Sequence, residues 1–217
     1  LKNYFICFVD DSTTSNVFDE INKNFKKNYF VIRGPNLKNG RCAAVKKGFQ
    51  WIVKNISTET LIEIDSDLSY DPKDLLKVFK KNNENFDLFL GSKYLKKSTL
   101  IKRSFFRNML SFLVTKISSF FFKNNITDYT NGYRVYKKKF YRRLIRKKFE
   151  TDSPLENLNI ILYSIYLKAK IKEFPASYKG NSASHWAMDI YGITKLSLRT
   201  IYLILYYFLK INFSKKI

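Results

Sequence analysis

The chain has 217 residues, 45% of them hydrophobic, with 40 Lys and Arg against 18 Asp and Glu and a formal net charge of +22. This composition excludes a disulfide-dense mini-protein, a collagen-like chain and a disordered acidic tail, and the length predicts one domain with a sizeable core. The charge indicates an anionic partner: nucleic acid, a nucleotide substrate or an anionic membrane surface. The plain alternative is that much of the excess charge is a solvated lysine-rich face.

Short apolar runs alternate with amphipathic segments in the first part of the chain. The predicted order is strand, helix, strand, helix, strand, helix and strand, over residues 4–9, 18–25, 29–32, 42–55, 60–64, 71–81 and 86–90. Asp71 is expected to cap the third helix, and Pro72 to occupy its first turn. This alternation predicts an α/β fold with a mostly parallel sheet flanked by helices.

The pattern loosens after residue 91. We expect helices over 104–122, 137–146, 154–168 and 191–211, and strands at 133–136 and 171–174. The predicted organisation is an α/β domain over residues 1–190 and an amphipathic C-terminal helix over 191–217. No uncharged apolar run reaches the length needed to span a bilayer. The aromatic and basic character of the last helix suits either a membrane interface or packing on the core.

Two acidic pairs follow predicted strands. Asp10 and Asp11 come after the first strand, and Asp65 and Asp67 come after the third. Ligands of open parallel sheets bind at the carboxyl ends of the strands, and paired carboxylates there suit Mg²⁺ or Mn²⁺ bridging to phosphate. The alternative is that Asp65 and Asp67 only cap the next helix.

Residues 63–72 (E-I-D-S-D-L-S-Y-D-P) resemble the D-x-D segment of family-2 glycosyltransferases, in particular the branch that transfers mannose or glucose to dolichyl or polyprenyl phosphate. Further segments are similar to family motifs in the same order: 39–44 to G-x-G-x-A, 91–94 to G-S-R-Y, 128–134 to D-x-T-S-G-F-R and 173–175 to E-V-P. The resemblance implies a GT-A-type, Rossmann-like fold. The family's first strand, P-x-Y-N-E, has no counterpart, so we expect an N-terminal strand to be missing from this sequence.

The resemblance also implies how a nucleotide sugar is held. Asp67 would bind Mg²⁺ or Mn²⁺ on the donor diphosphate, with Asp65 supporting the same metal site. Asp10 and Asp11 stand in the place of the family's V-D-D and would face the nucleoside. The implied nucleotide-sugar-binding set is Asp10, Asp11, Gly40, Arg41 and Asp65.

Basic residues are implied to bind the phosphate of the acceptor. Arg134 would do so through its planar donors; the alternative is an exposed arginine on an edge strand. Arg103 and Arg107 resemble the family's paired basic positions beside the acceptor, or form a solvated helix face. Lys179 is the substitute for the family's basic loop R-x-x-G-x-S-K, which is not reproduced. The implied catalytic set is Asp65, Asp67 and Arg134.

The function implied is that of an inverting glycosyltransferase that moves a hexose from a GDP- or UDP-linked sugar to a polyprenyl phosphate or related acceptor. We expect it in the cytoplasm, peripheral at the cytosolic membrane face, without nucleic acid as a partner. A lipid phosphate is already anionic and needs no protein base, which fits a chain whose single histidine, His185, is expected in loop packing. A sugar hydroxyl would need a carboxylate base, for which Asp128 and Glu156 are candidates. The alternative function is a non-catalytic basic module that binds nucleic acid or adheres to a membrane.

Overall fold

The computed structural model describes residues 4–12, 16–34, 40–79, 85–146, 155–180 and 190–213, which belong to two units. The first unit comprises Leu1–Glu59 with Arg142–Glu156, and the second comprises Thr60–Tyr141 with Asn157–Ile217. The domain boundary predicted after residue 190 stays a prediction.

The first unit contains a pair of parallel strands. Its elements are β1 (Ile6–Asp10), α1 (Asn16–Asn24), β2 (Tyr29–Arg33) and α2 (Gly40–Asn55). The helix α2 lies close to β1 at Gly48, where an added Cβ atom would come within 2.8 Å of Val9 Cγ2. On the same helix, Trp51 stacks on Phe30 of β2 with 4.4 Å between the ring centroids. Aromatic stacking and a glycine contact thus hold α2 on the strand pair.

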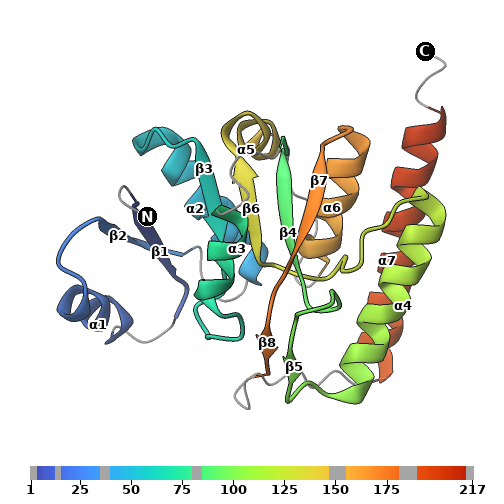
Figure 1. Cartoon of the computed structure of the whole chain (residues 1–217), viewed down its shortest axis with the longest axis horizontal. Helices are drawn as coiled ribbons and strands as arrows, with labels where there is room; N and C mark the ends of the chain where they lie inside the picture. Colours follow the sequence, from blue (N-terminus) through green and yellow to red (C-terminus); the bar gives the residue numbers. More distant parts are fainter. Residues whose placement is uncertain are drawn as a thin grey trace. The chain divides into compact units, whose positions relative to one another are not determined.

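A four-stranded sheet forms the centre of the second unit (Figure 1). Its strands, in spatial order, are β3 (Thr60–Glu63), β6 (Arg134–Lys137), β4 (Leu88–Ser92) and β7 (Ile171–Pro175). β6 is antiparallel to both β3 and β4, whereas β4 and β7 are parallel. The strands β3, β4 and β7 therefore point one way and β6 the other. Phe89, Val135 and Phe174 are almost completely buried in the core of this unit.

The remaining elements are the 3₁₀ turn η2 (Pro72–Asp74), α3 (Leu75–Phe79), β5 (Leu100–Ile101), α4 (Phe105–Phe122), α5 (Lys138–Ile145), α6 (Glu156–Tyr166), β8 (Tyr178–Lys179) and α7 (Ile190–Phe213). β5 and β8 pair in parallel as a small separate sheet. α4 and α7 run side by side in the second unit (Figure 1), where the rings of Phe121 and Phe208 are 5.2 Å apart. None of the described helices is long and apolar enough to cross a membrane.

The α/β class and the predicted order of the elements up to residue 90 are confirmed. Asp71 is the expected N-cap, since its Oδ1 accepts a hydrogen bond from the backbone N–H of Lys73 at 2.9 Å. Two features differ from the sequence prediction. The short strands β5 and β8 lack apolar periodicity and were not predicted, and nothing in the sequence of β6 indicated its antiparallel direction. Arg134 is also not on an edge strand, because β6 lies between β3 and β4.

Candidate active site

The loop after β3 carries Asp65 and Asp67 at the carboxyl end of a strand, as predicted. Asp65 is half-buried and Asp67 is exposed. Asp67 accepts two hydrogen bonds from Ser69, at 2.9 Å from its backbone N–H and at 2.6 Å from its hydroxyl. Between them Leu68 has a φ of 59°, a left-handed conformation that costs a non-glycine residue about 1–2 kcal/mol. Local backbone strain of this kind clusters at functional turns.

The donor atoms of this loop suit a hard divalent cation. The carboxylates of Asp65 and Asp67 are the oxygen ligands that Mg²⁺ and Mn²⁺ prefer. Within the described ranges, no group of three or more His, Cys, Asp or Glu side chains could hold a metal on protein ligands alone. A cation here would therefore complete its coordination with substrate phosphates and water, as Mg²⁺ usually does.

The pairing of β5 with β8 places basic residues beside this loop. The backbone N–H of Lys179 donates to the carbonyl of Ser69 at 2.8 Å, and Lys179 is opposite Ile101 in the register of β5 and β8. A side chain at Gly180 would collide with the backbone carbonyl of Lys102. The exposed Lys179 is thus anchored by its backbone to the acidic loop.

Arg103 follows β5 and is held by neutral groups. Its guanidinium donates to the Tyr94 hydroxyl at 3.2 Å, to Asn108 Oδ1 at 3.0 Å and to the Ser111 hydroxyl at 2.7 Å. It also lies over the ring of Tyr178, with 5.7 Å from Cζ to the ring centroid. Among the described residues no carboxylate forms an ion pair with Arg103. The guanidinium is therefore oriented by neutral groups. Arg107 lies one turn further along α4 and is half-buried.

The phenol of Tyr70 interacts electrostatically with both acidic and basic residues of this region. Tyr70 is buried, and it pairs with Tyr178 through an isolated antiparallel β-bridge. Burial, and then the negative charges of Asp128 and Asp65, raise the pKa of Tyr70 well above its ordinary value, and Arg103 acts in the opposite direction. Acidic and basic groups of the second unit thus act on one buried phenol.

Buried polar groups order the loop that follows α4. Lys93 Nζ lies 2.6 Å from Asp128 Oδ2, and both side chains are almost fully buried. Asp128 Oδ1 also accepts from the hydroxyl of Thr130 at 2.9 Å. Glu173 accepts from the backbone N–H of Thr127 at 2.9 Å and from that of Asp128 at 3.2 Å. Burial raises the pKa of Glu173 to about 7, although hydrogen bonds from Thr127 act to lower it.

Arg134 is completely buried. Its guanidinium donates to the carbonyl of Asn131 at 2.7 Å and to Asn157 Oδ1 at 2.8 Å. A further contact of 3.4 Å joins it to Glu63 Oε2, which also accepts from the Tyr136 hydroxyl at 2.6 Å. The guanidinium thus ties β3 and β6 to the start of α6 within the second unit.

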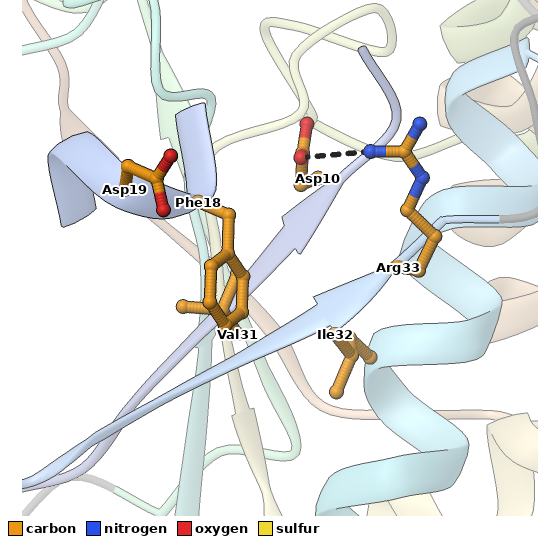
Figure 2. Close-up of a pocket in the computed structure, with 6 residues that line it drawn as sticks. All are labelled: Asp10, Phe18, Asp19, Val31, Ile32 and Arg33. Atoms are coloured by element: carbon orange, nitrogen blue, oxygen red, sulfur yellow. Dashed lines mark hydrogen bonds and ion pairs between the residues drawn. The ribbon is translucent and has the colours of Figure 1, made fainter. Parts of the chain in front are cut away.

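The first unit contains a hollow of about 340 Å³ at the end of its strand pair, lined by Asp10, Phe18, Asp19, Val31, Ile32 and Arg33 (Figure 2). Arg33 Nη1 lies 3.3 Å from Asp10 Oδ2, and the Ser12 hydroxyl donates to Asp10 Oδ1 at 2.6 Å. Burial acts to raise the pKa of Asp10, but the hydrogen bonds from Ser12 and the charge of Arg33 outweigh it, and the net effect lowers the pKa. Asp10 is therefore an ionised acceptor beside an aromatic ring.

The other sequence-predicted residues of the first unit are also located. Asp11 follows β1 directly and is half-buried, and Gly40 begins α2. Arg41 Nη1 lies 3.2 Å from Glu156 Oε1, and Glu156 is almost fully buried.

Both candidate bases are bound to cations, Asp128 to Lys93 and Glu156 to Arg41. These ion pairs disfavour either carboxylate as a general base, because a base needs free access to the proton it removes. His185 lies outside the described residues.

This chain belongs to glycosyltransferase family 2: the family model described as Glycosyl transferase family 2 matches residues 1–145. It is 31% identical over 144 residues to an uncharacterised protein of Methanocaldococcus jannaschii, covering 62% of this chain and 60% of that protein. It is 30% identical over 107 residues to the polyprenol monophosphomannose synthase of Mycolicibacterium smegmatis, covering 49% of this chain and 40% of the synthase. The chain therefore spans 60% and 40% of the length of these two relatives.

Solved structures confirm the GT-A-type fold. Glucosyl-3-phosphoglycerate synthase of Mycobacterium tuberculosis, in complex with uridine diphosphate, aligns with a TM-score of 0.53 at 12% identity, over 95% of this chain and 81% of that chain. The same enzyme with Mn²⁺, uridine diphosphate and phosphoglyceric acid aligns with a TM-score of 0.53 at 10% identity, over 95% and 79%. At these identities the likeness shows the fold alone.

Sequence reasoning missed several residues of these sites. Arg33 and Phe18 lack any motif. The parallel register that sets Asp10 opposite Arg33 identifies the arginine, and the lining of the hollow identifies Phe18. Lys93 had a signal, because it occupies the basic position of a segment that resembles G-S-R-Y. Its buried ion pair with Asp128 could not be predicted, since 35 residues separate the two in sequence.

Proposed function

We propose that this glycosyltransferase domain moves a hexose from a GDP- or UDP-linked sugar, with Mg²⁺ or Mn²⁺, to a polyprenyl phosphate or related acceptor at the cytosolic face of a membrane. The observation that carries the proposal is the loop with Asp65 and Asp67, whose Ser69 carbonyl is hydrogen-bonded to Lys179. Carboxylates for a cation and a lysine for a phosphate thus lie on neighbouring segments of one unit. The identity with a polyprenol monophosphomannose synthase gives further support.

The donor diphosphate is proposed to bind at the loop after β3. Asp67, with Asp65, would hold the cation, which when bound neutralises charge on the diphosphate leaving group. Ser69 keeps the Asp67 carboxylate oriented through its two hydrogen bonds.

For the first unit, we propose that Asp10 and Asp11 contact the nucleoside of the donor. The hollow beside Asp10 supports this role, because it combines an ionised hydrogen-bond acceptor with the ring of Phe18 (Figure 2). Gly40 and Arg41 complete the predicted donor-binding residues of this unit.

Transfer is proposed to proceed as one inverting displacement. An oxygen of the acceptor phosphate attacks the anomeric carbon, and the bond from that carbon to the diphosphate oxygen breaks. The electron pair of that bond leaves with the nucleoside diphosphate. Arg103 and Lys179, with Arg107, would hold the acceptor phosphate, so the rate arises from positioning and charge neutralisation. A phosphate contact for Arg134 stays a prediction, and its guanidinium is bound by protein groups inside the second unit.

Calorimetric titration with GDP and with UDP, each with and without Mn²⁺, tests the proposal. We expect one nucleotide to bind in a Mn²⁺-dependent way. Asp67→Asn should weaken that binding by roughly 100-fold or more, above the range of about 10–100-fold typical of an outer-sphere partner. The thermal unfolding midpoint should stay unchanged, because Asp67 is exposed. Glu20→Gln is the matched control, since it removes one exposed negative charge on α1.

Failure of both nucleotides to bind with Mn²⁺ would contradict the proposal. Together with nucleic-acid binding that falls steeply with salt, it would favour a non-catalytic basic module.

A further inference from the structure

Helix α4 has an inverted distribution of side chains. It buries Ser111, Thr115 and Ser118, whereas Phe105 and Phe120 are 83% and 79% exposed. A surface helix normally buries its apolar residues and exposes its polar ones. The inversion marks the outer side of α4 as an interaction surface.

The neighbouring helix α7 continues this apolar surface. Leu198, Tyr202 and Leu209 are each more than half exposed, whereas Tyr207 is buried. The two helices run side by side in the second unit (Figure 1), and both bury their opposite sides within it. We take their exposed apolar residues together as one candidate docking surface. We call it the α4–α7 face and define it by Phe105, Phe112, Phe120, Leu198, Tyr202 and Leu209.

The charged residues of these two helices have one sign. Neither α4 nor α7 contains an Asp or Glu residue, and both contain basic residues such as Lys116, Lys195 and Arg199. Lys210 donates to the Tyr206 hydroxyl at 3.1 Å, and this hydrogen bond raises the pKa of Lys210 and keeps it charged. Aromatic and basic side chains around an apolar stripe suit the boundary between hydrocarbon and anionic headgroups.

We infer that the α4–α7 face docks on the surface of a bilayer that contains anionic phospholipids. A second copy of this chain is a poorer occupant, because it would press two basic, acid-free surfaces together. The described helices do not span a membrane, so the contact lies in the interface plane.

This inference rests on the proposed function, in which a polyprenyl tail keeps the acceptor in the membrane and the enzyme must reach it there. Arg103 is hydrogen-bonded to Ser111 of α4. Docking through α4 would therefore bring a proposed phosphate-binding cation to the level of the headgroups.

Flotation of the full chain with lipid vesicles tests the inference. One set of vesicles contains phosphatidylcholine alone, and the other contains equal parts of phosphatidylcholine and phosphatidylglycerol. We expect the wild-type chain to float with the mixed vesicles. The partition coefficient of the Phe105→Ser/Phe120→Ser variant onto these vesicles should be lower by about tenfold or more. The matched control is Tyr4→Ser/Leu76→Ser, which removes two apolar side chains that are also more than half exposed but lie outside the face. Circular dichroism verifies that every variant is folded.

Equal partition of the Phe105→Ser/Phe120→Ser variant and the wild type would overturn the inference. A wild-type chain that stays in solution with both vesicle types, whether monomeric or self-associated, would also overturn the inference. Equal binding to both vesicle types would overturn the requirement for anionic lipid.

Nucleotide titration of the same proteins separates this result from the proposed function. The Phe variant should bind nucleotide as the wild type does, and a wild type without nucleotide binding would refute the proposed function while leaving vesicle binding intact.

Discussion

Replacement of Arg134 by methionine is expected to destabilise the second unit by about 4 kcal/mol, because removal of one partner of a buried ion pair typically costs about 3–5 kcal/mol. Arg134 is fully buried, and Glu63 is 6% exposed. The substitution leaves the Glu63 carboxylate in the interior with the Tyr136 hydroxyl at 2.6 Å but without the guanidinium. The carbonyl of Asn131 and the side chain of Asn157 lose hydrogen bonds as well. A loss of this size is a large fraction of the roughly 5–15 kcal/mol that keeps a domain folded.

Urea denaturation measures this effect. With a denaturant slope of about 2 kcal/mol per molar, the midpoint of Arg134→Met should fall by about 2 M. Arg142→Met is the matched control, since Arg142 is an exposed arginine of α5, and it should change stability by about 0.5 kcal/mol or less. The double variant Glu63→Gln/Arg134→Met should cost less than the sum of the single variants, because it removes both charges of the pair together.

A different result would refute this reasoning. If Arg134→Met unfolds at the wild-type urea concentration but no longer transfers sugar, then Arg134 acts on a ligand, as the family resemblance implies, and not on the packing of β3, β6 and α6. If stability and transfer are lost together and the double variant regains both, Arg134 is a positioning residue.

Two further predictions concern charge within the second unit. Because burial raises the pKa of Glu173 from 4.5 to about 7, the folded state binds this proton more tightly than the unfolded state, and the free energy of unfolding falls as pH rises between these values. Glu173→Gln should flatten that dependence in thermal unfolding followed from about pH 5 to about pH 8, and an unchanged slope would show that Glu173 does not titrate there. Arg103→Gln should raise the KM for a phosphate acceptor by roughly tenfold or more, since a hydrogen bond to a charged group is worth about 1.5–3 kcal/mol. Unchanged KM and unchanged kcat would place Arg103 away from the acceptor.

Local sequence information was sufficient for much of the fold. The apolar runs gave β1 to β4 and β7 within a few residues, and the hydrogen bond from Lys73 to Asp71 is the predicted helix cap. These features depend on hydrophobic period and turn chemistry, which neighbouring residues determine. The small sheet of β5 and β8 was missed, because each of its two-residue strands pairs with a strand about 78 residues away in sequence.

The candidate site was predicted as a set of residue types and only partly as an arrangement. The position of Asp65 and Asp67 after a strand followed from the sequence, because the strand period and the motif agree. The environment of Arg134 did not. An arginine on a short strand is usually exposed, and the tertiary structure buries it because β6 inserts between β3 and β4, where Glu63 is its partner.

The sequence by itself determined the family, the α/β class and the acidic and basic residues of the proposed chemistry, since all of these are encoded in short segments. Only the tertiary structure decided which charges are neutralised inside the protein and which stay available. Lys93 and Arg134 are paired with buried carboxylates, whereas Arg103 is held by neutral groups and Lys179 is exposed. It also decided that α4 exposes Phe105, Phe112 and Phe120. The physical reason is that burial and charge pairing depend on segments far apart in the chain, which no local pattern records.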